Sequence, residues 1–169
     1  MNVGDRQIYK GAILSLVLEQ HGLPNGRQGE FEVVRHPGGA AILPLLDDGR
    51  VVLIRQLRPV LGKVLWEIPA GRLEADETPE QCARRELREE AGYRAGRLEK
   101  LGEMLTAPGF CTEVVHLFVA RDLQPVHSAP EEDEVIEVFT FAREEALAMV
   151  RRGEIGDGKT QLALLLLPE

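Results

Sequence analysis

Three glutamates that lie close together in the sequence could bind a metal ion. Glu86, Glu89 and Glu90 fall within five residues of a helical pattern. At about 100° per residue they spread over roughly 100° of one helix face. Glutamates four residues apart repel each other, and near a helix C-terminus they also oppose the helix dipole. A hard cation that prefers oxygen ligands reverses this repulsion, and Mg²⁺ is the usual choice. The alternative is a solvent-exposed charged face whose glutamates pair with neighbouring arginines.

Both ends of the helix that carries these glutamates are marked in the sequence. Thr78 and Gln81 form a capping box, with proline at the first helical position between them. Gly92 follows where a residue of left-handed conformation is favoured. The sequence therefore predicts a helix over residues 79–91. Its narrow apolar stripe for packing on a sheet consists of Ala83, Leu87 and Ala91.

The remaining pattern predicts more strands than helices. Apolar and β-branched segments predict strands at residues 12–19, 30–35, 40–46, 50–57, 64–68, 98–105, 114–120 and 135–141. Further helices are expected over residues 142–152 and roughly 159–167. Residues 47–49, Asp-Asp-Gly, predict a hairpin-type turn. The short connections between strands favour a mixed or antiparallel sheet.

Length and composition limit the class of protein. The chain has 169 residues and a formal net charge of −8, which indicates one folded domain and argues against a basic nucleic-acid-coating surface. We find no apolar stretch long enough to span a membrane and no signal-peptide pattern. Two cysteines do not make a disulfide framework, so we expect a protein of the reducing cytoplasm.

The residues around the helix resemble a known motif. Residues 71–93 read GRLEADETPEQCARRELREEAGY, which resembles the Nudix box, G-x5-E-x7-R-E-U-x-E-E-x-G-U, where U is a bulky apolar residue. Only Tyr93 departs mildly, because it is aromatic and carries a hydroxyl. The matching positions are Gly71, Glu77, Arg85, Glu86, Leu87, Glu89, Glu90 and Gly92. Eight identities at fixed spacing make this a specific signal.

The resemblance implies a fold and a reaction class. The implied fold is α+β, with a mixed β-sheet in an α/β/α sandwich and an N-terminal antiparallel strand pair. We expect residues 1–169 to form one Nudix domain, in which residues 1–36 make a homodimer by exchanging strands. The implied reaction is hydrolysis of a nucleoside diphosphate linked to another group. Such a substrate is strongly anionic, so an acidic site would bind it through bridging cations.

The resemblance also implies a set of metal ligands. Glu86, Glu90 and the backbone carbonyl of Ala70 would bind Mg²⁺, with Mn²⁺ as a possible substitute. Glu89 would act in catalysis, bound to the ion directly or beside a ligand. Arg85 would orient the glutamates by bidentate pairing. Glu77, another residue of the box, would support the geometry of the loop and helix.

Motifs outside the box narrow the substrate. RQLR at residues 55–58, WEIPAG at 66–71, a proline 15 residues after Tyr93, and GKT at 158–160 look like those of ADP-ribose pyrophosphatases. The implied reaction is hydrolysis of ADP-ribose to AMP and ribose 5-phosphate. One alternative is another nucleotide sugar, such as GDP-mannose or ADP-glucose. A second, from a different class, is a non-catalytic module that binds an ADP-ribose-like ligand.

Carried over by position, several residues would contact the substrate. Arg58 would contact the phosphates or the terminal ribose, and Arg72 would do so mainly through its backbone. Glu113 would accept hydrogen bonds from ribose hydroxyls. The plain alternatives are a surface arginine at a strand end and a charge at the rim of the site. A region that the family uses for substrate contacts across subunits contains Phe31, Glu32 and His36.

The general base is expected on an acidic loop, Pro-Glu-Glu-Asp-Glu at residues 130–134. By resemblance, Glu132 is the base, Glu134 an additional metal ligand and Glu131 the reserve candidate. A loop that closes over the substrate would let such a carboxylate take a proton from water. The alternative is a flexible solvated loop.

Two further residues are assigned structural roles. Trp66, the only tryptophan, lies in an apolar strand, so we expect it in the core or at a dimer interface rather than stacked on adenine. Cys82 is expected to be structural, because magnesium does not favour thiolate ligands.

Overall fold

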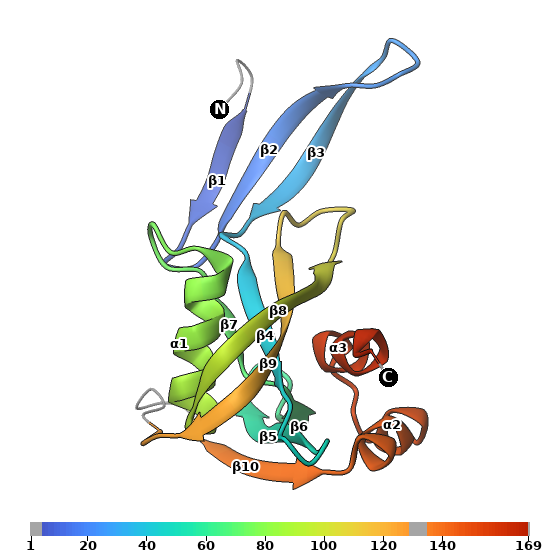
Figure 1. Cartoon of the computed structure of the whole chain (residues 1–169). Helices are drawn as coiled ribbons and strands as arrows, with labels where there is room; N and C mark the ends of the chain where they lie inside the picture. Colours follow the sequence, from blue (N-terminus) through green and yellow to red (C-terminus); the bar gives the residue numbers. More distant parts are fainter. Residues whose placement is uncertain (1–4, 129–134, 169) are drawn as a thin grey trace. The chain divides into compact units, whose positions relative to one another are not determined.

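The computed structural model describes residues 5–128 and 135–168, and within them the chain forms ten strands and three helices (Figure 1). The order is β1 (Arg6–Lys10), β2 (Ser15–Gly22), β3 (Gln28–Arg35), β4 (Gly39–Pro44), β5 (Val51–Arg58), β6 (Lys63–Glu67), β7 (Ala70–Arg72), α1 (Pro79–Ala91), β8 (Tyr93–Leu105), β9 (Val114–Pro125), β10 (Ile136–Phe141), α2 (Arg143–Arg151) and α3 (Gly158–Leu166). These elements make two compact units, one of residues 5–38 and 105–114 and one of residues 39–104, 115–128 and 135–168.

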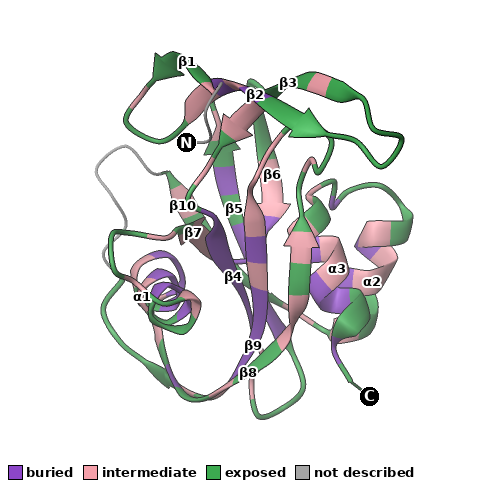
Figure 2. Ribbon diagram, turned by 90° about the horizontal axis from the view of Figure 1, so that it is seen from above, coloured by how far each residue is buried: buried purple, intermediate pink, exposed green. Residues whose placement is uncertain are grey.

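The larger unit contains two sheets. One is antiparallel with the order β10-β5-β6, and the other has the order β7-β4-β9-β8. In the second sheet β4 runs parallel to β9 and antiparallel to β7, so the predicted mixed sheet is confirmed. Strands β4 and β9 are buried along much of their length (Figure 2). Central strands of this kind are apolar on both faces.

The hairpin-type turn predicted at residues 47–49 is confirmed, although the strands on its two sides belong to different sheets. Gly49 has a φ of 84°, and its N–H donates to the carbonyl of Leu46. A single bridge joins Leu45 to Val51, after which β4 and β5 enter different sheets. The turn therefore passes the chain from one sheet to the other.

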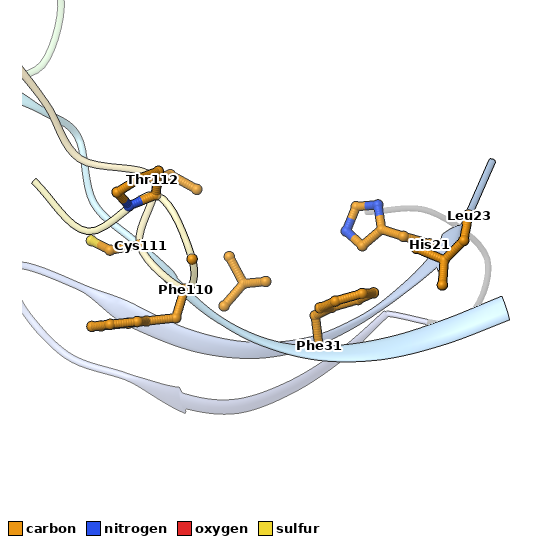
Figure 3. Close-up of a pocket in the computed structure, with 9 residues that line it drawn as sticks. His21, Leu23, Phe31, Phe110, Cys111 and Thr112 are labelled. Carbon is orange, nitrogen blue, oxygen red and sulfur yellow. The ribbon is translucent and has the colours of Figure 1, made fainter. Parts of the chain in front are cut away.

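The smaller unit consists of the antiparallel sheet β1-β2-β3 and the loop of residues 105–114. The loop is bound to β3, since the N–H of Val34 donates to the carbonyl of Phe110 and the N–H of Thr112 donates to that of Val34. A pocket of about 310 Å³ lies in this unit. Figure 3 shows Phe110 on one side of it and His21 with Phe31 on the other.

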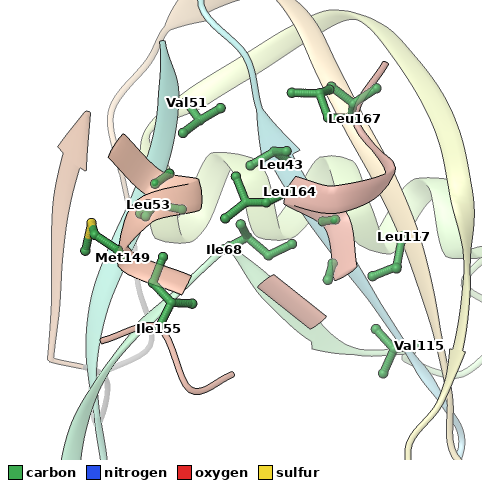
Figure 4. Packing of buried hydrophobic residues seen from close by; sticks show 14 residues of the cluster. Leu43, Val51, Leu53, Ile68, Val115, Leu117, Met149, Ile155, Leu164 and Leu167 are labelled. Carbon is green, nitrogen blue, oxygen red and sulfur yellow. The ribbon is translucent and has the colours of Figure 1, made fainter. Parts of the chain in front are cut away.

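Helices cover both faces of the central strand β4. Its odd residues, such as Leu43, belong to a cluster with Leu164 of α3, Met149 of α2 and Ile68 (Figure 4). Its even residues, such as Ile42, belong to a second cluster with Leu87 of α1. The side-chain alternation of a strand thus divides the core between α1 and the two C-terminal helices. The predicted α/β/α layering is confirmed.

Helix α1 has the bounds that the sequence predicts. Thr78 Oγ1 accepts from the N–H of Gln81 at 3.3 Å, and the Gln81 side chain accepts from the N–H of Thr78 at 2.8 Å. Gly92 ends the helix in the left-handed conformation, with φ 70°. The apolar stripe is buried, so the capping signals and the periodicity are both confirmed.

Other boundaries differ from the prediction. Strand β8 starts at Tyr93, and β9 continues to Pro125. Strands β1 and β7 were not predicted, because β1 is exposed along its whole length and β7 has only three residues. Trp66 packs edge-to-face on Phe139 and Phe141, which supports its core assignment. None of the described helices is long and apolar enough to cross a membrane.

Candidate active site

Two of the three glutamates lie on the inner side of α1. Glu86 is 8% exposed and Glu90 is 2% exposed. The carboxylate of Glu90 accepts a hydrogen bond from the N–H of Ala70 at 2.7 Å. For these two residues, the alternative of a solvent-exposed charged face is therefore wrong. Two carboxylates are instead held against β7, where burial raises the cost of their charge unless it is compensated.

Gly71 allows the Glu86 carboxylate to approach the backbone of β7. A Cβ atom at position 71 would overlap Oε1 and Cδ of Glu86 and lie 2.9 Å from Oε2. The space above Gly71 is thus filled by the carboxyl group. Glycine is therefore required at the start of the box because any side chain there would collide with Glu86. A positive φ is not the cause.

Arg85 connects most of the box carboxylates. It makes a bidentate pair with Glu77, at 2.9 and 3.0 Å, and its Nη1 contacts Glu86 at 2.6 Å and Glu89 at 3.3 Å. The bidentate partner is therefore Glu77, whereas Glu86 and Glu89 are contacted through one nitrogen. The hydrogen bond from Arg85 holds the pKa of Glu77 below its usual value. Glu77 also accepts from the N–H of Glu74, which fits its expected role in the loop.

Glu89 has a different environment from the other two glutamates. Its side chain is 24% exposed and pairs with Arg88 at 2.6 Å as well as with Arg85. It is therefore the accessible member of the three. Its expected role in catalysis stays a prediction.

Arg72 and Cys82 stabilise the turn into the helix. The carbonyl of Arg72 accepts from Arg85 Nη2 at 3.1 Å and from the Cys82 thiol at 3.3 Å. Burial raises the pKa of the Cys82 thiol to about 12. A thiol that stays protonated at neutral pH is a poor metal ligand, which fits the structural role expected for Cys82.

Arg58 pairs with a buried carboxylate, and its expected contact with the substrate stays a prediction. It lies at the end of β5 and makes two hydrogen bonds to Glu67, at 2.8 and 2.7 Å. Glu67 is 1% exposed and also accepts from Lys159. Sequence analysis missed this network, although Glu67 and Lys159 both stand within the quoted motifs WEIPAG and GKT.

In the smaller unit, two predicted substrate residues meet. His36 Nδ1 lies 3.3 Å from Glu113 Oε1, and the N–H of His36 donates to Thr112 Oγ1. Glu32 lies on β3 opposite Leu18 and is exposed. The pocket in this unit was not predicted as a whole. It is lined by His21, Leu23, Phe31, Val33 and residues 108–112.

The donor set fits a hard divalent cation. The box offers buried carboxylate oxygens close to the backbone of Ala70 and Gly71, whereas the nearby thiol is protonated. Within residues 5–128 and 135–168, no three His, Cys, Asp or Glu side chains converge closely enough to enclose an ion. The predicted base Glu132, its reserve Glu131 and the predicted ligand Glu134 lie outside the described residues.

Comparison with known proteins assigns the family. Residues 35–161 match the family model of the NUDIX domain, and the chain belongs to the Nudix family. Enzymes of this family generally use divalent metal ions.

Curated relatives extend over most of the chain. It is 41% identical over 167 residues to the ADP-ribose pyrophosphatase of Bacillus subtilis, with 98% of this chain and 90% of the relative covered. It is 38% identical to the methanol dehydrogenase activator of Bacillus methanolicus, covering 95% and 88%. It is 44% identical to the GDP-mannose pyrophosphatase of Cronobacter sakazakii, covering 79% and 78%.

A solved structure agrees in fold. The crystal structure of an ADP compounds hydrolase superimposes with a TM-score of 0.82, covering 97% of this chain and 89% of that one. The sequence identity is 20%, so this likeness confirms the predicted Nudix fold alone.

Proposed function

We propose that the chain is a hydrolase that cleaves the diphosphate of ADP-ribose to give AMP and ribose 5-phosphate. One observation carries the proposal: Glu86 and Glu90 are buried against β7 at the matching positions of the Nudix box. The 41% identity to a protein named ADP-ribose pyrophosphatase supports the substrate. The motifs at residues 55–58, 66–71 and 158–160 support the same subgroup.

The metal would be Mg²⁺, with Mn²⁺ as a possible substitute. Glu86, Glu90 and the carbonyl of Ala70 would hold it, with Glu134 as an additional ligand. When bound, such a cation neutralises diphosphate charge and lowers the pKa of the attacking water. Hard oxygen donors suit Mg²⁺ better than a softer ion.

The chain's own residues would supply proton transfer and binding. Glu132 would accept the proton of the attacking water, and Glu89, the accessible box carboxylate, would also act in catalysis. Arg58 would bind the phosphates, since a guanidinium matches phosphate oxygens in geometry and charge. Arg72 would contact the substrate mainly through its backbone, whose carbonyl also accepts hydrogen bonds from Cys82 and Arg85.

Three residues that are predicted to bind the substrate belong to the smaller unit. Glu113 would accept from ribose hydroxyls, and His36 and Glu32 would add polar contacts. The contact between His36 and Glu113 supports a shared role for these two residues. Two aromatic rings, Phe31 and Phe110, line the pocket of this unit and offer surfaces on which a base can stack.

We further propose that the whole chain works as one Nudix domain in a cytoplasmic homodimer. Exposed apolar side chains of β1 and the loop after it support a dimer built by residues 1–36, because such groups are usually covered in an assembly. They are Ile8, Tyr9, Ile13 and Leu14. The free cysteines, Cys82 and Cys111, are compatible with a reducing compartment.

A second substrate is favoured by specific relatives. GDP-mannose is the candidate, because several relatives between 40% and 44% identical are named GDP-mannose pyrophosphatases. The same metal site would serve either diphosphate, so the choice depends on contacts to the base and the sugar.

One panel of substrates tests the proposal. ADP-ribose, ADP-glucose and GDP-mannose are incubated with Mg²⁺ in oxygen-18 water, and the labelled products are identified by mass spectrometry. ADP-ribose should have the highest kcat/KM, and equal rates on GDP-mannose would contradict the substrate. Binding of ADP-ribose without turnover of any substrate would indicate the non-catalytic module instead.

Variants of α1 test the site itself. Glu86→Gln and Glu90→Gln should each lose most of kcat, because each removes a proposed metal ligand. Glu80→Gln is the matched control on the same helix, since Glu80 is exposed and pairs only with Arg84 among the described residues. Retained activity in both site variants would refute the metal assignment.

A further inference from the structure

Glu67, the last residue of β6, is a buried carboxylate bound by two cations. Arg58 donates to its two oxygens at 2.8 and 2.7 Å, and Lys159 donates to Oε2. Burial alone would raise the pKa of Glu67, but hydrogen bonds and charges from Arg58 and Lys159 outweigh burial and lower it. Glu67 is therefore ionised at neutral pH.

The start of α3 also binds the residue that follows Glu67. Asp157 pairs with Lys159 at 3.0 Å and accepts from the N–H and the hydroxyl of Thr160. The Thr160 hydroxyl oxygen in turn accepts from the N–H of Ile68 at 2.8 Å. Two consecutive residues at the end of β6, Glu67 and Ile68, are thus bound to one helix end that lies about ninety positions later in the sequence.

Stability alone does not account for this arrangement. Removing two or more charges from water is costly, and well-packed apolar residues often stabilise a protein as much as a buried ion pair does. The surrounding core is apolar, with Ile54 and Ile68 almost fully buried. A buried ion-pair network in such surroundings calls for a reason other than packing.

The network holds one group that extends to the surface. The Arg58 side chain is 38% exposed, whereas those of Lys159 and Glu67 are 13% and 1% exposed. Guanidinium has five N–H donors, and two of those of Arg58 are used on Glu67. The other three make no hydrogen bond with the described residues.

The exposed group lies near the box glutamates. Glu67 precedes Ala70 by three positions, and the N–H of Ala70 binds Glu90. The hydrogen bond with Glu67 is the main cause that raises the pKa of Arg58, and the charge of Glu90 contributes to the same shift. The guanidinium is thus within electrostatic range of Glu90.

We propose that Glu67 is a positioning residue, which fixes the Arg58 guanidinium so that its remaining N–H groups meet the substrate diphosphate. Lys159, held by Asp157, fixes Glu67 from the other side. A guanidinium that is already oriented loses less freedom when it binds phosphate. The inference rests on the proposed diphosphate hydrolysis and adds to it a residue that does not touch the substrate.

The test compares Glu67→Gln, Arg58→Ala and the double variant. Steady-state kcat and KM for ADP-ribose are measured at saturating Mg²⁺, with thermal unfolding and Mg²⁺ affinity beside them. Glu67→Gln should lower kcat/KM about 10²-fold, the effect of misplacing a contact group by roughly 1 Å. Mg²⁺ affinity should stay within a factor of about three, because Glu86 and Glu90 are untouched. The double variant should be no worse than Arg58→Ala, because both changes remove the same oriented group.

Two controls separate positioning from stability. Ile155→Val lowers the stability of the core without touching the network, and it should leave kcat/KM unchanged. Glu67→Asp keeps the charge and should recover part of the activity lost in Glu67→Gln, even if the glutamine variant folds poorly. Multiplicative losses in the double variant, or an unchanged kcat/KM in Glu67→Gln, would overturn the proposal.

Failure of the proposed function can be told apart from failure of the positioning role. If the wild-type protein hydrolyses no nucleotide sugar, the function fails, and calorimetry with ADP-ribose then tests positioning by binding. Weaker ADP-ribose binding in Glu67→Gln than in wild type would still support the role of Glu67. Equal affinities, or no binding by either protein, would overturn it.

Discussion

Gly71→Ala should damage catalysis far more than folding. The added methyl would overlap the Glu86 carboxyl group, with Oε2 at 2.9 Å and Oε1 and Cδ closer still. Ordinary contact begins at 3.4 Å, so the carboxylate must move by roughly 1 Å or more. It would also leave its contact with Arg85 Nη1, now 2.6 Å.

Gly71→Ala should lower the free energy of unfolding only slightly. The atoms that must move are the far end of a flexible side chain, and Gly71 does not have a positive φ, so alanine is compatible with its backbone. Overpacking costs about 1–3 kcal/mol, and the loss of glycine freedom in the unfolded chain returns about 0.4–1 kcal/mol. We expect a net loss of about 1 kcal/mol in the free energy of unfolding. Displacement of a proposed metal ligand by roughly 1 Å should lower kcat/KM about 10²-fold.

The assay combines ADP-ribose hydrolysis, calorimetric Mg²⁺ binding and urea unfolding. Gly156→Ala is the matched control, because a Cβ there meets nothing within 4 Å. Gly39→Ala gives the opposite contrast, since its Cβ would lie 2.6 Å from the backbone carbonyl of Gly71 and should destabilise the β4–β7 pair. If Gly71→Ala keeps kcat/KM within about threefold of wild type, the placement of Glu86 as a ligand is refuted.

Three further predictions follow from the same region. Cys82, fully buried and with its pKa raised to about 12, should resist a thiol reagent at pH 8 in the native protein and react after unfolding, as followed by mass spectrometry. Glu77→Gln should destabilise the protein most at neutral pH. The hydrogen bond with Arg85 is the main cause of the lowered pKa of Glu77. The stability that Glu77 contributes is therefore complete above its ordinary pKa of 4.5 and is lost as the pH falls through the lowered pKa. A constant difference between pH 7 and pH 2 in urea titrations would contradict this. Thr78→Ala removes one half of the capping box and should cost about 1 kcal/mol in the free energy of unfolding, with kcat unchanged.

The sequence was sufficient where structure is local. The bounds of α1 followed from Thr78, Gln81 and Gly92, because capping bonds join residues three or four apart. The box predicted which glutamates share a face, since helical spacing fixes their relative angles. Its specific spacing also indicated the family before any contact was known.

The sequence by itself determined α1, its caps and the set of box residues, whereas tertiary structure decided how they are used. Burial of Glu86 and Glu90 depends on β7, a three-residue strand that pairs with β4. The parallel pairing of β4 with β9 likewise joins segments more than seventy residues apart. The tie between Glu67 and Lys159 spans 92 positions. No local pattern encodes such contacts, because they form only when the whole apolar core closes around them.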